Sequence, residues 1–249
     1  MPTPLRIAIW SGPRCRSTAL LRAWENRADT VVSDEPLYAV YLASTGLDHP
    51  GRSEILAALS TDWREVAAAL TGPIPGGADL WVQKHMAHHL LPQVGREWLD
   101  APGWQHAFLI RDPAALVVSL DKVWPGPSLP DTGLPQQVEL FNRTRQQTGA
   151  VPPVVDADDL LADPPGVLAA LCARLGVPFD PAMLAWTAGP RASDGVWAPH
   201  WYDSVWRSTG WGTPRAEATV VPERLRPLVE AAQPLYDALA AHRITAPNR

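Results

Sequence analysis

Short apolar runs alternate with helix-length segments along the chain, and this alternation limits the possible folds more than any other feature. The apolar runs, which have the length of buried strands, cover residues 5–10, 30–33, 80–84, 106–111 and 153–156. Patterns typical of helices cover residues 17–26, 53–59, 62–70, 113–121, 135–147, 166–175 and 223–242. Strands that alternate with helices predict an α/β fold, in which helices cover both faces of a parallel sheet in three layers.

The chain has the size and composition of one globular domain. Its 249 residues lie at the upper end of the usual single-domain range, roughly 100–250 residues. We find no internal repeat, no low-complexity tract and no linker that would divide it. We therefore expect a single domain over residues 1–249.

Charge and cysteine usage exclude several classes of protein. The 21 Lys and Arg residues against 26 Asp and Glu give a net charge of −5, which disfavours nucleic-acid binding but allows a local cationic pocket. The two cysteines, Cys15 and Cys172, form no disulfide framework and indicate a reducing compartment. With no leader-like N-terminus and no apolar run of about 20 residues, the sequence predicts a cytoplasmic protein without a membrane segment.

The segment 10–18 joins the first predicted strand to the first predicted helix. At such a junction, free backbone N–H groups and the helix dipole favour an anion. Gly12 permits a tight turn, and the residues after it supply cationic and hydroxyl groups: Arg14, Arg16, Ser17 and Thr18. The two hydroxyl residues can also cap the helix. The segment therefore predicts a phosphate cradle, although an ordinary strand–turn–helix junction without a ligand remains an alternative.

Two other phosphate loops do not match this segment. It lacks the Gly-Lys-Ser/Thr of a Walker A loop, although Asp112 and Asp156 follow apolar strands as Walker B carboxylates do. A tyrosine-phosphatase loop would begin at Cys15 and would need an arginine where the chain has Leu21. A small-molecule kinase with a variant P-loop remains an alternative, as does a nucleotide-binding protein without catalytic activity.

The same residues resemble a known loop. The run Pro13-Arg14-Cys15-Arg16-Ser17-Thr18 is similar to the 5′-phosphosulfate loop of sulfotransferases that use 3′-phosphoadenosine-5′-phosphosulfate (PAPS). The resemblance implies a P-loop NTPase-like sulfotransferase architecture and places the 5′-phosphate against residues 12–18. Arg16 stands where that family usually has glycine.

A second motif resembles the 3′-phosphate site of the same family. Arg111 ends the fourth predicted strand, and Ser119 follows eight residues later in a predicted helix. The planar guanidinium of arginine suits a dianionic phosphate because it can bond two oxygens. Pairing of Arg111 with Asp112 or another carboxylate is the alternative. Two phosphate sites separated by an adenosine account for both motifs together.

The resemblance extends over nearly the whole chain. Residues 34–38, 83–86, 132–137 and 194–202 are similar to the sulfotransferase-like half of plant proteins named branched-chain-aminotransferase-like. No aminotransferase half is present. The implied reaction moves a sulfuryl group from PAPS to a hydroxyl or amine of a small-molecule acceptor and leaves 3′-phosphoadenosine-5′-phosphate (PAP). A metal ion is not required, and the sequence does not indicate an oligomeric state.

The implied reaction needs a general base and a cation near the leaving group. Glu35 is the expected base, since some sulfotransferases use a glutamate after the second strand. Asp34 is a competing carboxylate, and an N-terminal cap for a helix over 37–45 is the alternative role. Lys84-His85 resembles the Lys-X-His of cytosolic sulfotransferases, which makes Lys84 an electrophilic candidate and His85 a second candidate base. Because strand neighbours alternate, His85 should point away from Lys84.

Further residues are expected around the acceptor and over the donor. The spacing of His85, His88 and His89 also allows a zinc site, but we expect no metal. Residues 194–222 contain four of the 12 tryptophans and resemble a loop that closes over PAPS, with Arg207 meeting the 3′-phosphate. The expected acceptor pocket comprises Tyr38, His88, His200 and Trp201.

Overall fold

The computed structural model describes residues 4–214 and 218–245 and contains a five-stranded parallel sheet. The strands are β1 (Leu5–Ser11), β2 (Thr30–Asp34), β3 (Leu80–Met86), β4 (Trp104–Ile110) and β5 (Val154–Asp156). Their order is β2-β3-β1-β4-β5, and every neighbouring pair is parallel. The predicted α/β fold and all five predicted strands are confirmed. Of the expected segment 194–222, residues 215–217 lie outside the described residues.

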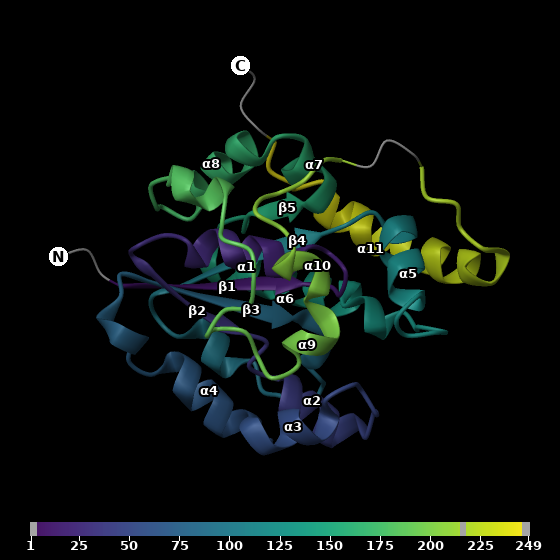
Figure 1. The fold of residues 1–249 in the computed structure, drawn as a ribbon, viewed down its shortest axis with the longest axis horizontal. Coiled ribbons are helices and arrows are strands. Elements are labelled where there is room, and N and C mark those ends of the chain that lie inside the picture. Colours follow the sequence, from purple (N-terminus) through teal and green to yellow (C-terminus); the bar gives the residue numbers. More distant parts are fainter. Residues whose placement is uncertain (1–3, 215–217, 246–249) are drawn as a thin grey trace.

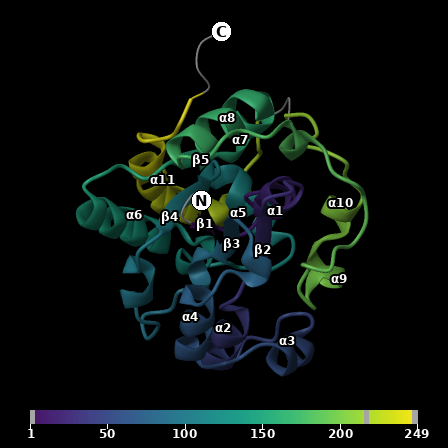
Figure 2. The ribbon, with the colours of Figure 1, turned by 90° about the vertical axis from the view of Figure 1, so that its left-hand side faces the viewer.

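The central strand β1 is buried on both sides, and its side chains alternate between two cores. Ile7 and Ile9 face one core, whereas Ala8 and Trp10 face the other. This alternation follows from the two-residue period of a strand. Figure 2 shows the consequence, with helices on both faces of the sheet.

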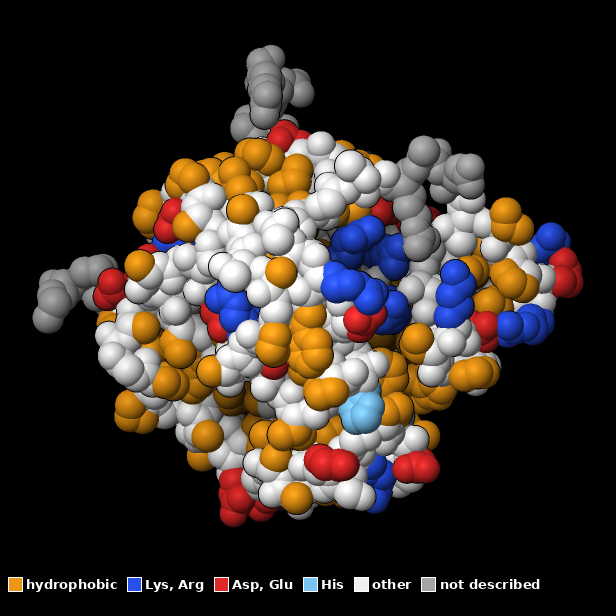
Figure 3. Space-filling view, in the orientation of Figure 1, with side chains coloured by type: hydrophobic (Ala, Val, Ile, Leu, Met, Phe, Trp, Pro, Cys, Tyr) orange, Lys and Arg blue, Asp and Glu red, His pale blue; other side chains and the backbone are white. Residues whose placement is uncertain are grey.

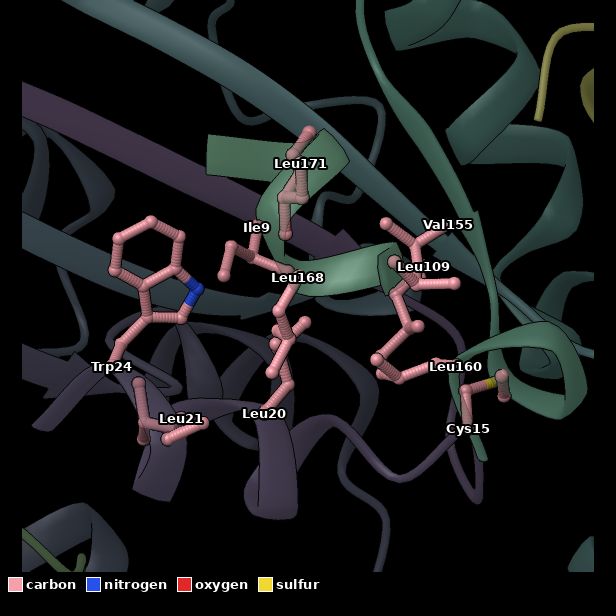
Figure 4. Close-up of a cluster of buried hydrophobic side chains, with 14 of the residues drawn as sticks. Ile9, Cys15, Leu20, Leu21, Trp24, Leu109, Val155, Leu160, Leu168 and Leu171 are labelled. Carbon is pink, nitrogen blue, oxygen red and sulfur yellow. The ribbon is translucent and has the colours of Figure 1, made fainter. Parts of the chain in front are cut away.

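Four helices cover the first face. They are α1 (Ser17–Glu25), α5 (Pro113–Asp121), α7 (Ala157–Ala162) and α8 (Pro164–Arg174). Figure 4 shows Leu20 and Trp24 of α1 together with Leu168 and Leu171 of α8, packed around Ile9. These contacts fix the N-terminal end of α1 next to the C-terminal end of β1.

Three helices cover the opposite face, and four shorter ones form a separate cluster with each other. The first three are α4 (Trp63–Thr71), α6 (Leu134–Thr148) and α11 (Arg226–Ala240). A third buried cluster joins α2 (Tyr38–Thr45) and α3 (Arg52–Ala58) to the C-terminal segment that contains α9 (Ala198–Trp201) and α10 (Asp203–Trp206). Figure 1 shows α9 and α10 lying across the face of the molecule near the ends of the central strands.

The predicted helices all occur within a few residues of their expected bounds, but α7, α9 and α10 were not predicted. The last two are four residues long and carry no helical periodicity that a sequence could reveal. Helix α7 begins at Asp156, whose side chain accepts a 2.8 Å hydrogen bond from the Asp158 amide. Within the described parts of the chain, none of the helices has both the length and the apolar character that crossing a membrane requires.

Candidate active site

A cavity of about 480 Å³ opens at the carboxyl ends of the central strands. Ligands of open parallel sheets bind at this edge. The loop after β1, the residues after β2, β3 and β4, helix α5 and the segment 201–212 all line it. In Figure 3, Lys and Arg side chains gather next to a hollow on the face that carries α9 and α10.

The loop after β1 takes a backbone conformation that L-residues rarely adopt. Arg14 has φ 62° and Arg16 has φ 63°, both in the left-handed region. This conformation costs about 1–2 kcal/mol for a residue other than glycine. Glycine adopts this conformation without that cost, which explains why the resembling family has glycine at the position of Arg16. In this chain the loop takes the same conformation although Arg16 carries a side chain.

The start of α1 differs from the sequence-based prediction. Ser17 and Thr18 were expected to cap the helix, but its N-cap is Arg16 and no side chain caps it. Thr18 Oγ1 instead accepts a 3.2 Å hydrogen bond from Lys84 Nζ. Because backbone N–H groups at the first turn lack a side-chain cap, they are available to an anion in the cavity.

Only a glycine fits at position 12, because the backbone there packs closely against the backbone of Thr132. A Cβ at this position would lie 2.3 Å from the carbonyl oxygen of Thr132. When the amide of Gln137 is oriented to satisfy its partners, it accepts a 3.1 Å hydrogen bond from the Gly12 amide and donates to the Trp10 carbonyl. Gln137 was not predicted as a site residue, although the resembling segment 132–137 contains it.

The left-handed conformation of Arg16 gives a first testable prediction. We expect Arg16→Gly to be more stable than Arg16→Ala by roughly 1 kcal/mol, because both variants lose the side chain but only alanine keeps the Cβ that opposes this conformation. Chemical denaturation of the two variants measures the difference in unfolding free energy. An alanine variant that equals or exceeds the glycine variant would contradict the assigned backbone conformation.

One half of the cavity is cationic. Arg14 Nε donates a 3.2 Å hydrogen bond to Ser119 Oγ, and Arg111 donates a 2.7 Å hydrogen bond to the Arg14 carbonyl. The alternative in which Asp112 pairs with Arg111 is wrong, because Asp112 caps α5 by accepting from the Ala115 amide at 2.9 Å. The sequence-predicted pair Arg111 and Ser119 thus contacts Arg14 in the loop after β1.

Two of the arginines in this half, Arg14 and Arg111, are not paired with a carboxylate in the described part of the chain. In the described ranges 4–214 and 218–245, no carboxylate forms an ion pair with Arg14 or Arg111, and the buried Nε of Arg111 has no hydrogen-bond partner. Burial and the neighbouring Arg111 lower the pKa of Arg14. A bound anion would relieve both the repulsion and the missing hydrogen bond.

A buried cluster of opposite charges lies beside the cationic half. Lys84 Nζ is 2.7 Å from Asp34 Oδ1 and 2.9 Å from Glu35 Oε1. It also donates a 2.8 Å hydrogen bond to the Tyr202 hydroxyl. Burial alone lowers the pKa of Lys84, but the two carboxylates outweigh it, so that the pKa is raised. Lys84 therefore stays charged and fixes both acids in place.

Glu35 lines the cavity, and its backbone is strained, with φ 42°. The alternative role as a helix cap is wrong, because the N-cap of α2 is Leu37 and no side chain caps this helix. Burial raises the pKa of Glu35, Lys84 opposes the rise, and Asp34 adds to it. Both of its side-chain contacts involve Oε1, which leaves Oε2 as the oxygen that can meet a ligand.

Two sequence-predicted residues lie outside this cavity because of strand and loop geometry. His85 points to the opposite side of the sheet from Lys84, as the alternation of β3 predicts, and stacks on Trp10 with ring centroids 4.4 Å apart. Burial lowers the pKa of His85 to about 3. Cys15 turns into the core of the first face, where burial raises the pKa of its thiol to about 12.

Aromatic rings form the other half of the cavity. Tyr38 stacks on His89 with centroids 4.7 Å apart, and its hydroxyl lies 2.9 Å from Nδ1 of His49. His88 and Trp124 also line this half. Of these five, only Tyr38 and His88 were expected in the acceptor pocket; His89 was considered only as a zinc ligand, and no motif marks His49 or Trp124. In the part of the chain that the structure describes, no three His, Cys, Asp or Glu side chains are grouped as a metal site requires.

Burial keeps these imidazoles uncharged. It lowers the pKa of His88 to about 3, and it lowers the pKa of His49 and His89 as well. A histidine with so low a pKa is a poor proton acceptor near neutral pH. His88 is therefore placed to contact a ligand rather than to act as a base.

The C-terminal segment supplies one wall of the cavity. Trp201 lines it as predicted, and Tyr202 and Trp211 line it without having been predicted. Two other predicted residues do not reach it: His200 is exposed, and Arg207 is exposed and pairs with Asp203. The single turns of α9 and α10 direct these two side chains outward.

The segment is anchored outside the cavity by Asp194. Its carboxylate is within 2.7 Å of the Arg22 guanidinium and accepts a 2.9 Å hydrogen bond from Trp206 Nε1. Trp197, next to this anchor, is buried in the cluster shared with α2 and α3. The cavity-lining end is held as well, because Trp211 Nε1 donates a 3.1 Å hydrogen bond to the Met183 carbonyl and Gly210 forms a β-bridge with Ala185.

Comparison with known proteins identifies relatives over almost the full length. Two proteins of Arabidopsis thaliana, branched-chain-amino-acid aminotransferase-like proteins 1 and 2, are 38% and 36% identical to the chain over 243 and 236 residues. These matches cover 97% and 95% of the chain but only 43% and 41% of the relatives. The chain therefore spans less than half the length of these plant proteins.

Solved structures with the same fold are sulfotransferases. A sulfotransferase from Alicyclobacillus acidocaldarius is 16% identical, with a TM-score of 0.57 and 98% of each chain covered. A sulfotransferase domain from the curacin biosynthetic pathway is 18% identical, with a TM-score of 0.50, covering 100% of this chain and 95% of its own. The model of the sulfotransferase domain family matches residues 5–243. The chain belongs to the sulfotransferase domain family.

Proposed function

We propose that the protein transfers the sulfuryl group of PAPS to a hydroxyl group of a small, uncharged acceptor. One observation carries the proposal: the cavity places Arg14 and Arg111, with which no described carboxylate pairs, and an uncapped helix start on one side of the buried Glu35 carboxylate, with aromatic walls on the other. Such a division suits a polyanionic donor and an uncharged acceptor that meet at a base.

The donor half fits a nucleotide with two phosphate groups. In the proposed complex, residues 12–18 hold the 5′-phosphosulfate with backbone N–H groups and the side chains of Arg14 and Arg16. Arg111 and Ser119 hold the 3′-phosphate, and the unpartnered Nε of Arg111 gains a hydrogen-bond acceptor. Each charge-assisted hydrogen bond contributes about 1.5–3 kcal/mol.

The proposed reaction is a single in-line displacement. Glu35 Oε2 accepts the proton of the acceptor hydroxyl while the acceptor oxygen forms a bond to sulfur. The bond between sulfur and the bridging phosphate oxygen breaks, and its electron pair leaves with PAP. The arginines and amides of the donor half stabilise the charge that develops on the departing phosphate. Lys84 keeps Glu35 Oε1 fixed, so that Oε2 faces the acceptor.

The acceptor half favours an uncharged ligand. Its imidazoles carry no charge near neutral pH, because burial lowers the pKa values of His49, His88 and His89. Among the described residues, the basic side chains that line the cavity are Arg14, Arg16 and Arg111, and all three belong to the donor half. An anionic acceptor would therefore lack a counter-ion, whereas a neutral ring can pack against Tyr38 and Trp201.

The proposal predicts that PAP stabilises the protein without added metal. At a concentration about 100 times its dissociation constant, a ligand specific for the native state adds about 2.7 kcal/mol of stability, which raises Tm by roughly 5–10 °C for a chain of this size. Thermal unfolding in the presence of EDTA measures the shift, with adenosine as the matched control. Stabilisation by ATP that requires magnesium, with none by PAP, would favour the kinase alternative instead.

A further inference from the structure

Tyr202 connects the C-terminal segment to the buried cluster of Asp34, Glu35 and Lys84. Its hydroxyl accepts hydrogen bonds from Lys84 Nζ at 2.8 Å and from Trp197 Nε1 at 3.0 Å. It donates to Asp34 and lies 3.4 Å from Glu35 Oε1. We propose that Tyr202 is a positioning residue that couples the packing of the segment 194–214 against the cluster to the placement of Glu35. This inference deepens the proposed function and rests on it for the role of Glu35.

The hydroxyl of Tyr202 is fully used in this arrangement. A hydroxyl has one donor and two acceptor sites, and here it donates to Asp34 and accepts from Lys84 and Trp197. Burial and the neighbouring carboxylates raise its pKa well above the usual value, so that it remains a neutral donor. The ring is 4% exposed. The Tyr202 hydroxyl is therefore a fixed hydrogen-bonding group rather than one that exchanges protons with the acceptor.

Removal of the hydroxyl would disturb Glu35 in two ways. Lys84 would lose one of its four contacts, and Asp34 Oδ2 would lose the hydroxyl that donates to it, so the lysine would be held less firmly between the two acids. Glu35 would also lose its 3.4 Å contact with the hydroxyl, a contact that lowers its pKa. The first effect changes the position of Glu35 and the second changes its pKa, although Tyr202 itself takes no proton.

The packing of the segment 194–214 and the placement of Glu35 are linked because Tyr202 belongs to the segment. Tyr202 lies between α9 and α10, and Trp201 beside it lines the cavity. If the segment moves away, the hydroxyl leaves the cluster with it. Linkage is reciprocal, so a change that weakens the cluster must also loosen the segment.

The test compares Tyr202→Phe with Tyr236→Phe. Tyr236 is a matched control, because its hydroxyl donates a 2.8 Å hydrogen bond to Asp156 away from the cavity. We expect Tyr202→Phe to lower turnover by about 10–100-fold, the usual effect of a group that orients a catalytic residue, with PAP affinity unchanged. Tyr236→Phe should leave turnover as it is.

The pH profile separates positioning from a general loss of structure. Glu35 is surrounded by Asp34 from β2, Lys84 from β3, Tyr38 from α2 and Tyr202 from the segment. A base acts only when ionised, so turnover falls as pH drops through its pKa. Because the contact with the Tyr202 hydroxyl lowers the pKa of Glu35, its loss should move this acidic limb to higher pH.

A second arm does not depend on activity. Asp34→Asn and Tyr202→Phe should each speed amide hydrogen exchange of residues 197–208 by about tenfold or more, while exchange in β1 stays as in the wild type. Unchanged exchange in both variants, or wild-type turnover and pH profile in Tyr202→Phe, would overturn the inference. If the wild-type protein neither binds PAP nor consumes PAPS, the proposed function fails, and the exchange arm still decides whether segment and cluster are coupled.

Discussion

Replacing Glu35 by glutamine is expected to lower the turnover of sulfuryl transfer by a factor of about 10²–10⁴, the usual contribution of a positioned general base. Glutamine keeps the shape of the side chain and can still accept a hydrogen bond from Lys84 through its amide oxygen. It cannot take the proton of an acceptor hydroxyl. Single-turnover transfer from labelled PAPS measures the loss, and slow hydrolysis of PAPS serves where no acceptor has been found.

Two controls make this result specific to Glu35. Glu139→Gln applies the same change to a surface carboxylate that pairs with Arg96 outside the cavity, and it should leave turnover unaltered. PAP affinity should be nearly the same in Glu35→Gln as in the wild type, because the carboxylate belongs to the acceptor side. A fully active Glu35→Gln would remove Glu35 from the mechanism.

Replacing Arg111 by alanine is expected to weaken PAP binding by about 2–4 kcal/mol, or roughly 30–1000-fold, since its charge-assisted hydrogen bonds form in a partly desolvated site. AMP, which has no 3′-phosphate, should bind almost as it does to the wild type. Isothermal titration calorimetry with both nucleotides measures the two affinities.

The comparison of nucleotides matters because Arg111 also has a structural contact. Its guanidinium donates to the Arg14 carbonyl in the loop that would hold the 5′-phosphate. Equal losses for PAP and AMP would therefore show that Arg111 supports the loop rather than the 3′-phosphate. Arg243→Ala is the matched control, because Arg243 pairs with Asp159 on the surface.

The fold was largely predictable, because short stretches of the sequence indicate each of its strands and most of its helices. Each strand is a short apolar run, and the alternation with helices allows few arrangements other than a covered parallel sheet. The loop expected to bind phosphate could be proposed for the same reason: it is one continuous segment, residues 10–18. The direction of His85 followed from the two-residue period of β3.

The remaining site residues depend on contacts between distant segments. Tyr202 reaches Asp34 across a separation of 168 residues, and Gln137 reaches Gly12 from another helix. No local pattern distinguishes such a tyrosine or glutamine from an ordinary core residue. The expected cap of α1 was wrong because the left-handed backbone of Arg16 cannot be inferred from an arginine in the sequence. Arg207 was misplaced because a basic residue in a loop does not reveal which way a single helical turn directs it.

The central claim is that this cavity moves a sulfuryl group from PAPS, and transfer of radioactive sulfur from PAPS tests it most directly. The protein is incubated with labelled PAPS, EDTA and a set of uncharged and anionic hydroxyl compounds, and the labelled products are separated from the donor. We expect the label to pass to an uncharged acceptor while PAP accumulates in equal amount, with Glu35→Gln strongly impaired. Label that stays on PAPS at the rate of the protein-free control, for every acceptor tested and despite tight PAP binding, would contradict the account and favour a nucleotide-binding protein without transferase activity.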